Sequence, residues 1–179
     1  MSKATVYTIG HSTREFAEVL ACLRRNSVDT LVDVRSFPSS RKHPQWNQDA
    51  IIAALPEDLQ YRWIRNLGGR RHTPAGVASP NGGWRVKAFS DYADYMRTPK
   101  FQDGLTELMD LTQERTPAIM CSEAVPWRCH RRLITDALLV RGYDVRHIMS
   151  GRSTKPASLT PFAAVDGTEL TYPPGGDHD

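Results

Sequence analysis

Length, composition and charge place the chain among single-domain globular proteins. It has 179 residues, of which 40% are hydrophobic and 24% charged, and its net charge is +3. A domain commonly spans about 100–150 residues, so we expect one domain over residues 1–150 and a Pro/Gly-rich tail over residues 151–179. No apolar stretch approaches the roughly 20 residues that a membrane helix needs, which excludes a membrane partner. No secretory signal precedes the first strand, and three cysteines are too few for a disulfide-stapled fold, so the sequence predicts a cytoplasmic protein with free thiols.

The amino-terminal part of the chain has the pattern of a strand, a helix and a second strand. Residues 6–9 are β-prone and end at Gly10, after which Ser12 and Glu15 have the spacing of a helix capping box. Apolar residues then recur at helical intervals, and residues 30–34 have the pattern of a buried strand. Such a unit places two parallel strands in one sheet, with their carboxyl ends at the same edge.

The rest of the chain alternates helices and strands around one long loop. Residues 65–88 carry five glycines and two prolines without periodicity, which indicates a basic loop near a functional site. Because each connection between strands contains a helix or a long crossover, the sequence predicts an α/β fold with a mainly parallel sheet and flanking helices, a Rossmann-like three-layer arrangement. The proline-rich tail should be irregular except where residues 159–165 dock on the domain. The remaining predicted elements are helices at 47–55, 89–97, 98–114 and 127–141 and strands at 59–64, 118–121 and 144–149.

The densest group of reactive side chains follows the fourth predicted strand. Cys121 and Glu123 lie at the end of that strand, and Cys129, His130 and Arg131 open the next helix. Free amides and the positive end of the helix dipole favour an anion there, either a substrate phosphate or a thiolate. Because Cys129 should lie within the first helical turn, we assign it as the candidate nucleophile.

Other interpretations of this cluster stay open. Taken singly, each cysteine or histidine is more often a packed core residue than a catalyst. Cys121, Cys129 and His130 are acceptable zinc or iron ligands, although adjacent side chains diverge by about 100° on a helix and do not easily face one ion. The order strand, Cys121, loop, Arg128, helix is also similar to the phosphate loop of cysteine phosphatases and the persulfide loop of rhodaneses. The loop here is one residue longer than in the phosphatases and holds Glu123, which would repel phosphate.

Two further motifs lie at the ends of the first two predicted strands. His11 follows Gly10 and should project over the sheet edge as an acid, a base or a ligand, while Ser12 caps the helix. Strand alternation puts Asp33 and Arg35 on one face, and a carboxylate inside so apolar a strand requires a partner. Either Arg35 or His11 can be that partner.

Positive charge is concentrated in the middle of the chain. Between residues 35 and 87 there are nine Lys or Arg against three acids, a local charge of +6. Arg41 and Lys42 form one basic stretch, and Arg70 and Arg71 follow two glycines whose amides also suit phosphate oxygens. A solvated charged face and an anion-binding face explain this composition equally well.

These motifs together resemble the bacterial and archaeal domain-of-unknown-function family 488. The resemblance spans about residues 5–150 and implies an α/β domain marked by the residues described above, but it implies no reaction. The residues that carry it are 8–12, 32–35, 67–69, Cys121-x-Glu123 with Cys129-His130-Arg131, and His147-Ile148.

The sequence leads to two functional hypotheses. The first is an enzyme for a phosphate-bearing or other anionic substrate, and the second is a non-catalytic module that binds nucleic acid or a metal. No cofactor is identified, and no metal site is assigned. The predicted catalytic residues are Cys129, His11, His130, Glu123 and Cys121, and the predicted substrate-binding residues are Arg35, Arg131, Ser12, Asp33, Arg41 and Arg70.

Overall fold

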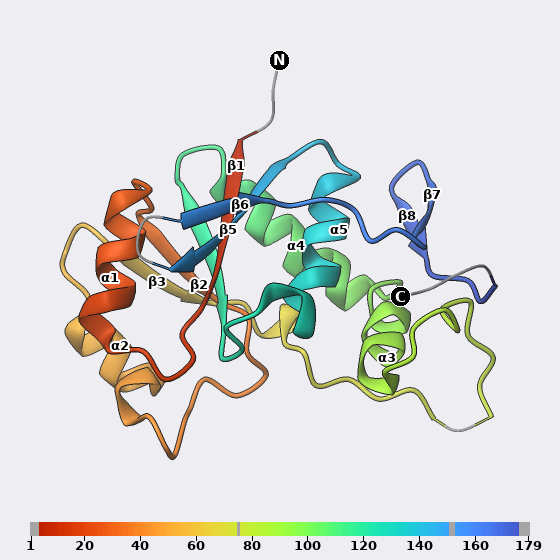
Figure 1. Cartoon of the computed structure of the whole chain (residues 1–179), viewed down its shortest axis with the longest axis horizontal. Coiled ribbons are helices and arrows are strands. Elements are labelled where there is room, and N and C mark those ends of the chain that lie inside the picture. Colours follow the sequence, from red (N-terminus) through yellow and green to blue (C-terminus); the bar gives the residue numbers. More distant parts are fainter. Residues whose placement is uncertain (1–3, 75, 151–152, 176–179) are drawn as a thin grey trace.

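A six-stranded sheet forms the centre of the protein in the computed structural model, which describes residues 4–74, 76–150 and 153–175 (Figure 1). The strand order is β3-β2-β4-β1-β5-β6. All neighbours from β3 to β5 are parallel, which confirms the predicted α/β sheet, and β6 runs antiparallel to β5. The strands are β1 (Thr5–Gly10), β2 (Thr30–Asp33), β3 (Gln60–Trp63), β4 (Pro117–Cys121), β5 (Asp144–Ser150) and β6 (Ser153–Pro156).

Helices cover both faces of this sheet and complete the three layers. α1 and α2 lie on one face, and α3, α4 and α5 lie on the other (Figure 1). Successive strand residues point to opposite faces, so Leu31 joins the core under α1 and α2 whereas Val32 joins the other core. Among the described residues, no helix has the length and apolar character needed to cross a membrane. The helices are α1 (Phe16–Arg25), α2 (Gln48–Ala54), α3 (Lys87–Tyr95), α4 (Pro99–Leu111) and α5 (Arg131–Leu139), with short 3₁₀ turns at Pro44–Trp46, Arg65–Leu67 and Pro126–Arg128.

The first helix begins later than the capping-box pattern predicts. Glu15 is the N-cap of α1, and no side chain caps this end of the helix. Ser12 instead has a φ of 48°, and its amide donates to the Ser122 carbonyl at 3.0 Å. The capping prediction for Ser12 is wrong because the chain beyond β1 first pairs with the segment that follows β4.

The carboxy-terminal segment packs on the domain. It is largely irregular, as its prolines indicate, but it includes β6 and a small hairpin of β7 (Ala164–Asp166) and β8 (Glu169–Thr171). The side chain of Tyr172 is fully buried, and its hydroxyl donates to Asp136 of α5 at 2.7 Å. The Thr160 amide donates to the same carboxylate, which agrees with the predicted docking of this region. Leu170 and Tyr172 of this segment therefore belong to the core of the α3–α5 side, whereas β7 is exposed.

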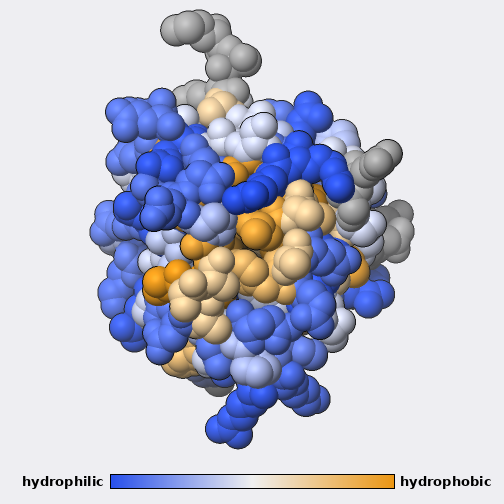
Figure 2. Space-filling model, turned by 90° about the vertical axis from the view of Figure 1, so that its left-hand side faces the viewer, coloured by the Kyte–Doolittle hydropathy of each residue, from blue (hydrophilic) through white to orange (hydrophobic). Residues whose placement is uncertain are grey.

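The outer sides of α1 and α2 are partly apolar. Ala17 and Ala21 of α1 are exposed, and Ile52 of α2 is 56% exposed. Figure 2 shows this face, on which apolar side chains gather within hydrophilic surroundings. No described contact shows what covers this patch, so this face carries no functional assignment.

The strand order creates a crevice between β1 and β4. The chain leaves β1 toward β2 through α1 on one face, and it leaves β4 toward β5 through α5 on the other face. At such a switch point the two connections diverge and leave a crevice outside the carboxyl ends of the strands, where open α/β folds bind ligands. His11 and Ser122 are the first residues beyond these two strands, so the topology positions the predicted motifs at this crevice.

Candidate active site

A cavity of about 780 Å³ opens at the carboxyl ends of β1, β2 and β4. Most of the predicted site residues line this cavity, although they come from four separate segments of the chain. Its volume is within the usual range for small-molecule and cofactor sites. The lining residues are His11, Arg35, Ser36, Phe37, Ser39, Ser40, Arg41, Gly69, Arg70, Ala88, Phe89, Cys121, Ser122, Glu123, Arg128, Cys129 and His130.

Cys129 and His130 contact each other at the floor of the cavity. Cys129 has extended backbone angles and precedes the helix, so the prediction that it lies in the first helical turn is wrong. His130 is the N-cap of α5. Because Cys129 is outside the helix, the two adjacent side chains converge, with 3.4 Å between Cys129 Sγ and His130 Nδ1. The expected divergence of these side chains is therefore also wrong.

The surroundings of His130 fix its tautomer. Its Nε2 lies 2.7 Å from the Val34 carbonyl oxygen, which can only accept, so Nε2 carries the proton in the neutral ring. Burial lowers the pKa of His130 and thus favours that neutral ring. The lone pair of Nδ1 then faces Cys129 Sγ, and His130 is placed to take the thiol proton. This is the relation of nucleophile, base and orienting group on which cysteine catalysis depends.

Gly69 leaves room for this histidine. A Cβ at Gly69 would lie 2.6 Å from His130 Nδ1 and 2.8 Å from its Cγ. The ring cannot easily move away, since Val34 holds one side and Tyr92 packs edge-on against it at a centroid distance of 5.2 Å. Glycine at this position is needed for close packing rather than for an unusual backbone angle.

We predict that Gly69→Ala destabilises the protein by about 1–3 kcal/mol, the usual cost of overpacking. The free energy of unfolding in urea, followed by circular dichroism, measures this cost. Gly82→Ala is the matched control, because a Cβ there would meet Pro174 at an ordinary 3.7 Å. Equal stability of the two variants would show that His130 can shift without loss.

Arg131 lies beneath the cavity and does not line it. Its side chain is buried, and its guanidinium donates to Cys121 Sγ at 3.0 Å, Thr8 Oγ1 at 3.0 Å and the Glu123 carbonyl at 2.6 Å. These contacts occupy the guanidinium within the protein, so the structure does not place Arg131 as a direct anion binder. Among the residues that the structure describes, no carboxylate lies within 4.0 Å of this buried cation.

The pKa values of the two cysteines that line the cavity are shifted in opposite directions. Burial acts to raise the pKa of Cys129, but a hydrogen bond from Cys121, the charge of Arg131 and the Arg131 amide outweigh burial and lower it from 9.0 to about 7. Burial raises the pKa of Cys121 well above its ordinary value, and the hydrogen bond with Cys129 adds to this effect. Cys129 is consequently the more acidic of the two thiols, while the Cys121 thiol donates to the Glu123 carbonyl at 3.7 Å.

His11 and Arg35 form the opposite wall. His11 Nδ1 donates to the Ser12 carbonyl at 2.9 Å, which leaves Nε2 as the acceptor 3.4 Å from Arg35 Nη1. Trp46 stacks on the imidazole with a centroid distance of 4.8 Å. Burial lowers the pKa of His11 to about 4, so the ring is neutral at pH 7. A histidine in this state holds Arg35 in position and is a weak base.

Asp33 is the partner that holds Arg35. The carboxylate is fully buried, outside the cavity lining, and accepts from Arg35 Nε at 2.9 Å and from Nη2 at 2.7 Å. Tyr61 donates its hydroxyl to the same carboxylate at 2.6 Å. The predicted need of Asp33 for a partner is met by Arg35, whose remaining donors face the cavity. Asp33 itself positions Arg35 and is not placed to touch a ligand.

Loop residues supply the remaining charges. Arg41, Arg70 and Arg128 line the cavity from three different segments, opposed by the single carboxylate of Glu123. The Glu123 side chain is exposed and accepts from the Val125 amide at 3.3 Å. The Val34 and Ser12 carbonyls, and not Glu123, contact the rings of His130 and His11. These three arginines, which we call the cationic rim, thus line the same cavity as Cys121 and Cys129.

Several residues of the site were not predicted from the sequence. Val34 acts through its carbonyl, which every residue has, so no sequence signal could have identified it. Trp46 reaches His11 from a 3₁₀ turn 35 residues away. Arg128 was considered only as part of a phosphatase-like loop, although its place beside Cys129 is a usable signal. Of the described residues, no group of three or more His, Cys, Asp and Glu side chains is arranged to hold a metal ion.

Comparison with known proteins identifies a family and no named relative. No curated protein and no solved structure matches the chain significantly. The suspected resemblance, placed over about residues 5–150, is nevertheless confirmed by a family model. That model is described as "Domain of unknown function DUF488" and matches residues 15–138, more than half of the chain, so the protein belongs to this family.

Proposed function

We propose that the protein is an enzyme that uses Cys129 as a nucleophile toward an anionic, phosphate-bearing substrate. The observation that carries the proposal is the contact between Cys129 Sγ and the unprotonated Nδ1 of His130 at the floor of a basic cavity. A thiol is activated when an oriented base accepts its proton, and the thiolate then attacks an electrophilic centre of the substrate to form a covalent intermediate. The proton on His130 is afterwards available to the leaving group.

The buried charge of Arg131 supports this assignment. A cation without a carboxylate partner in the interior is costly unless another anion lies nearby. Cys129 accepts from the Arg131 amide at 3.4 Å, and Cys121 accepts from its Nε, so a thiolate here would compensate the charge. The positive end of α5 acts in the same direction. These contacts support an ionised cysteine at this site.

The cationic rim supports an anionic substrate. Arg41 and Arg70 line the cavity from loops and Arg128 from a 3₁₀ turn, and guanidinium groups form paired, charge-assisted hydrogen bonds with phosphate oxygens. Ser36 Oγ accepts from the Arg70 amide at 2.8 Å, which ties this arginine's backbone to the end of β2. A phosphate held at the rim would position an electrophile above Cys129.

Alkylation by iodoacetamide tests the nucleophile. With a pKa of about 7, Cys129 should be roughly half ionised at pH 7 and should react on the order of tenfold or more faster than Cys22, a buried residue of α1. Mass spectrometry of tryptic peptides gives the rate at each site. The rate at Cys129 should rise with pH through a midpoint near 7.

Two comparisons make this test decisive. Arg131→Met should move the midpoint of Cys129 upward, because it removes the charge that stabilises the thiolate. Arg146→Met, at an exposed arginine on β5, should leave the midpoint unchanged. If native Cys129 reacts as slowly as Cys22 across this pH range, it is a structural residue and the proposed function is wrong.

A further inference from the structure

Exposed aromatic side chains lie in and beside the basic cavity, and these point to the class of substrate. Phe37 lines the cavity and is 62% exposed, with the Arg70 guanidinium 5.4 Å from its ring centroid. Trp127 is 46% exposed and lies two residues before Cys129. Large exposed aromatic rings beside a cationic cavity are typical of sites that stack nucleic-acid bases.

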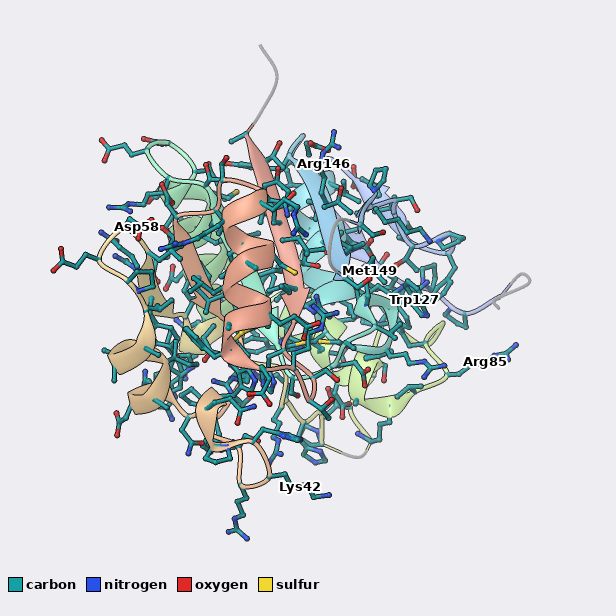
Figure 3. The ribbon with its side chains drawn as sticks, turned by 60° about the vertical axis from the view of Figure 1, so that its left-hand side comes forward. Lys42, Asp58, Arg85, Trp127, Arg146 and Met149 are labelled. Atoms are coloured by element: carbon teal, nitrogen blue, oxygen red, sulfur yellow. The ribbon has the colours of Figure 1, made fainter. Side chains whose placement is uncertain are left out.

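Trp127 belongs to an aromatic groove of about 380 Å³ that adjoins the basic cavity. Phe89 and Arg128 line both the groove and the cavity, so the two lie side by side. Figure 3 shows Trp127 and Arg85 on the same side of the molecule, with Lys42 projecting from its lower end. The residues lining the groove are Gly83, Trp84, Arg85, Val86, Phe89, Trp127, Arg128, Arg132 and Phe162.

The charges of the aromatic groove distinguish between occupants. Each ionisable side chain that lines it is an arginine, and no carboxylate is among the lining residues that the structure describes. An apolar peptide segment would leave these charges without a partner, whereas a nucleotide carries phosphate for them. The Arg132 guanidinium lies 5.1 Å from the Trp84 ring centroid, which is a cation–π contact. A nucleic-acid base stacked in the groove would add another ring to this contact.

Trp84 adds an unsatisfied donor to the groove wall. Its indole Nε1 is buried and has no hydrogen-bond partner among the described residues. Phe89 and Phe162 contact its ring edge-on, at centroid distances of 5.3 Å and 4.8 Å, so packing fixes the indole plane. A rigid aromatic wall loses little entropy when a base stacks beside it.

We propose that this surface binds single-stranded nucleic acid, with a phosphate in the basic cavity and the flanking bases on Phe37 on one side and in the aromatic groove on the other. The inference rests on the proposed function, since it names the polymer that would carry the phosphate to Cys129. A single strand fits better than a duplex because its bases are free to stack on side chains.

Fluorescence anisotropy with labelled oligonucleotides tests the proposal at fixed ionic strength. The probes are a short single strand, made as DNA and as RNA, and the same strand with abasic positions that keep each phosphate. The intact strand should bind more tightly than the abasic strand. Trp127→Ala and Phe37→Ala should each weaken intact-strand binding by about tenfold, as expected for the loss of one stacked base, and should leave abasic binding unchanged.

Controls separate stacking from charge. Val165→Ala removes an exposed apolar side chain on β7, outside the cavity and the aromatic groove, and should have no effect. Arg70→Ala should weaken intact and abasic strands alike, because it removes a phosphate contact. Equal affinity for intact and abasic strands in both DNA and RNA would overturn the proposal, as would unchanged binding by both aromatic variants.

The alkylation of Cys129 is an independent readout. If Cys129 is inert while the aromatic variants lose strand binding, the proposed enzyme fails and the nucleic-acid surface stands. If Cys129 is reactive while intact and abasic strands bind equally, the surface inference fails and the nucleophile stands. The two failures are therefore distinguishable.

Discussion

Asp33→Asn is expected to destabilise the protein by about 3–5 kcal/mol, the usual cost of leaving one partner of a buried ion pair without the other. Asp33 is fully buried, and Arg35 is 7% exposed. The substitution keeps the size of the side chain but removes the charge that Nε and Nη2 of Arg35 contact at 2.9 and 2.7 Å. It also weakens the acceptor of the Tyr61 hydroxyl.

The measurement is the free energy of unfolding in urea, with an exposed ion pair as control. Asp58 contacts Arg24 at 3.2 Å, and both side chains are largely exposed, so Asp58→Asn should cost less than about 1 kcal/mol. A small effect of Asp33→Asn, similar to that of Asp58→Asn, would mean that water or a rearranged Arg35 replaces the pair. The wall of the cavity would then be less rigid than its hydrogen bonds indicate.

Acidification is expected to remove stability between about pH 6.5 and pH 4 through His11. Burial lowers the pKa of His11 from 6.5 to about 4. The unfolded chain therefore binds a proton in this window while the native protein does not, and protonation favours unfolding as the pH falls. The stabilisation is complete above pH 6.5 and amounts to about 3 kcal/mol.

Variants are needed to assign this pH dependence. The pKa of His147 is also lowered to about 4, mainly by burial, so this histidine acts in the same window. Asp136 acts with the opposite sign, because burial raises its pKa. His11→Gln should therefore flatten the plot of unfolding free energy against pH only in part, and a second substitution at His147 should flatten it further. An unchanged slope in His11→Gln would show that the pKa of His11 is the same, near 6.5, in the native and the unfolded protein.

The repeating elements of the fold could be predicted from local sequence. Several of the five parallel strands contain short apolar runs, and each is followed by turn residues or by a helical pattern. Once helices separate the strands, a parallel sheet with two helical layers follows from chain connectivity. The residues just past strand ends then lie at one edge, which is why His11, Arg35, Cys121 and Cys129 could be assigned to a common site.

Helix starts could not be predicted, because they are decided by competition with distant contacts. Ser12 has a good capping sequence, but its amide bonds to Ser122, which lies 110 residues away, and α1 begins only at Phe16. Cys129 has a helical neighbourhood in the sequence, but it is extended and precedes α5. Local propensity is worth a few tenths of a kcal/mol per residue, so hydrogen bonds between segments override it readily.

The sequence by itself determined the α/β architecture and the kinds of reactive side chain that lie at the strand ends. Both follow from periodicity and spacing along one chain. The tertiary structure alone decided which side chain has which role. It turned Arg131 inward to the thiols and placed the loop residue Arg70 on the cavity. It also oriented His130 through the Val34 carbonyl, 96 residues earlier in the chain. These roles depend on distances of about 3 Å between segments remote in sequence, and no local pattern encodes such distances.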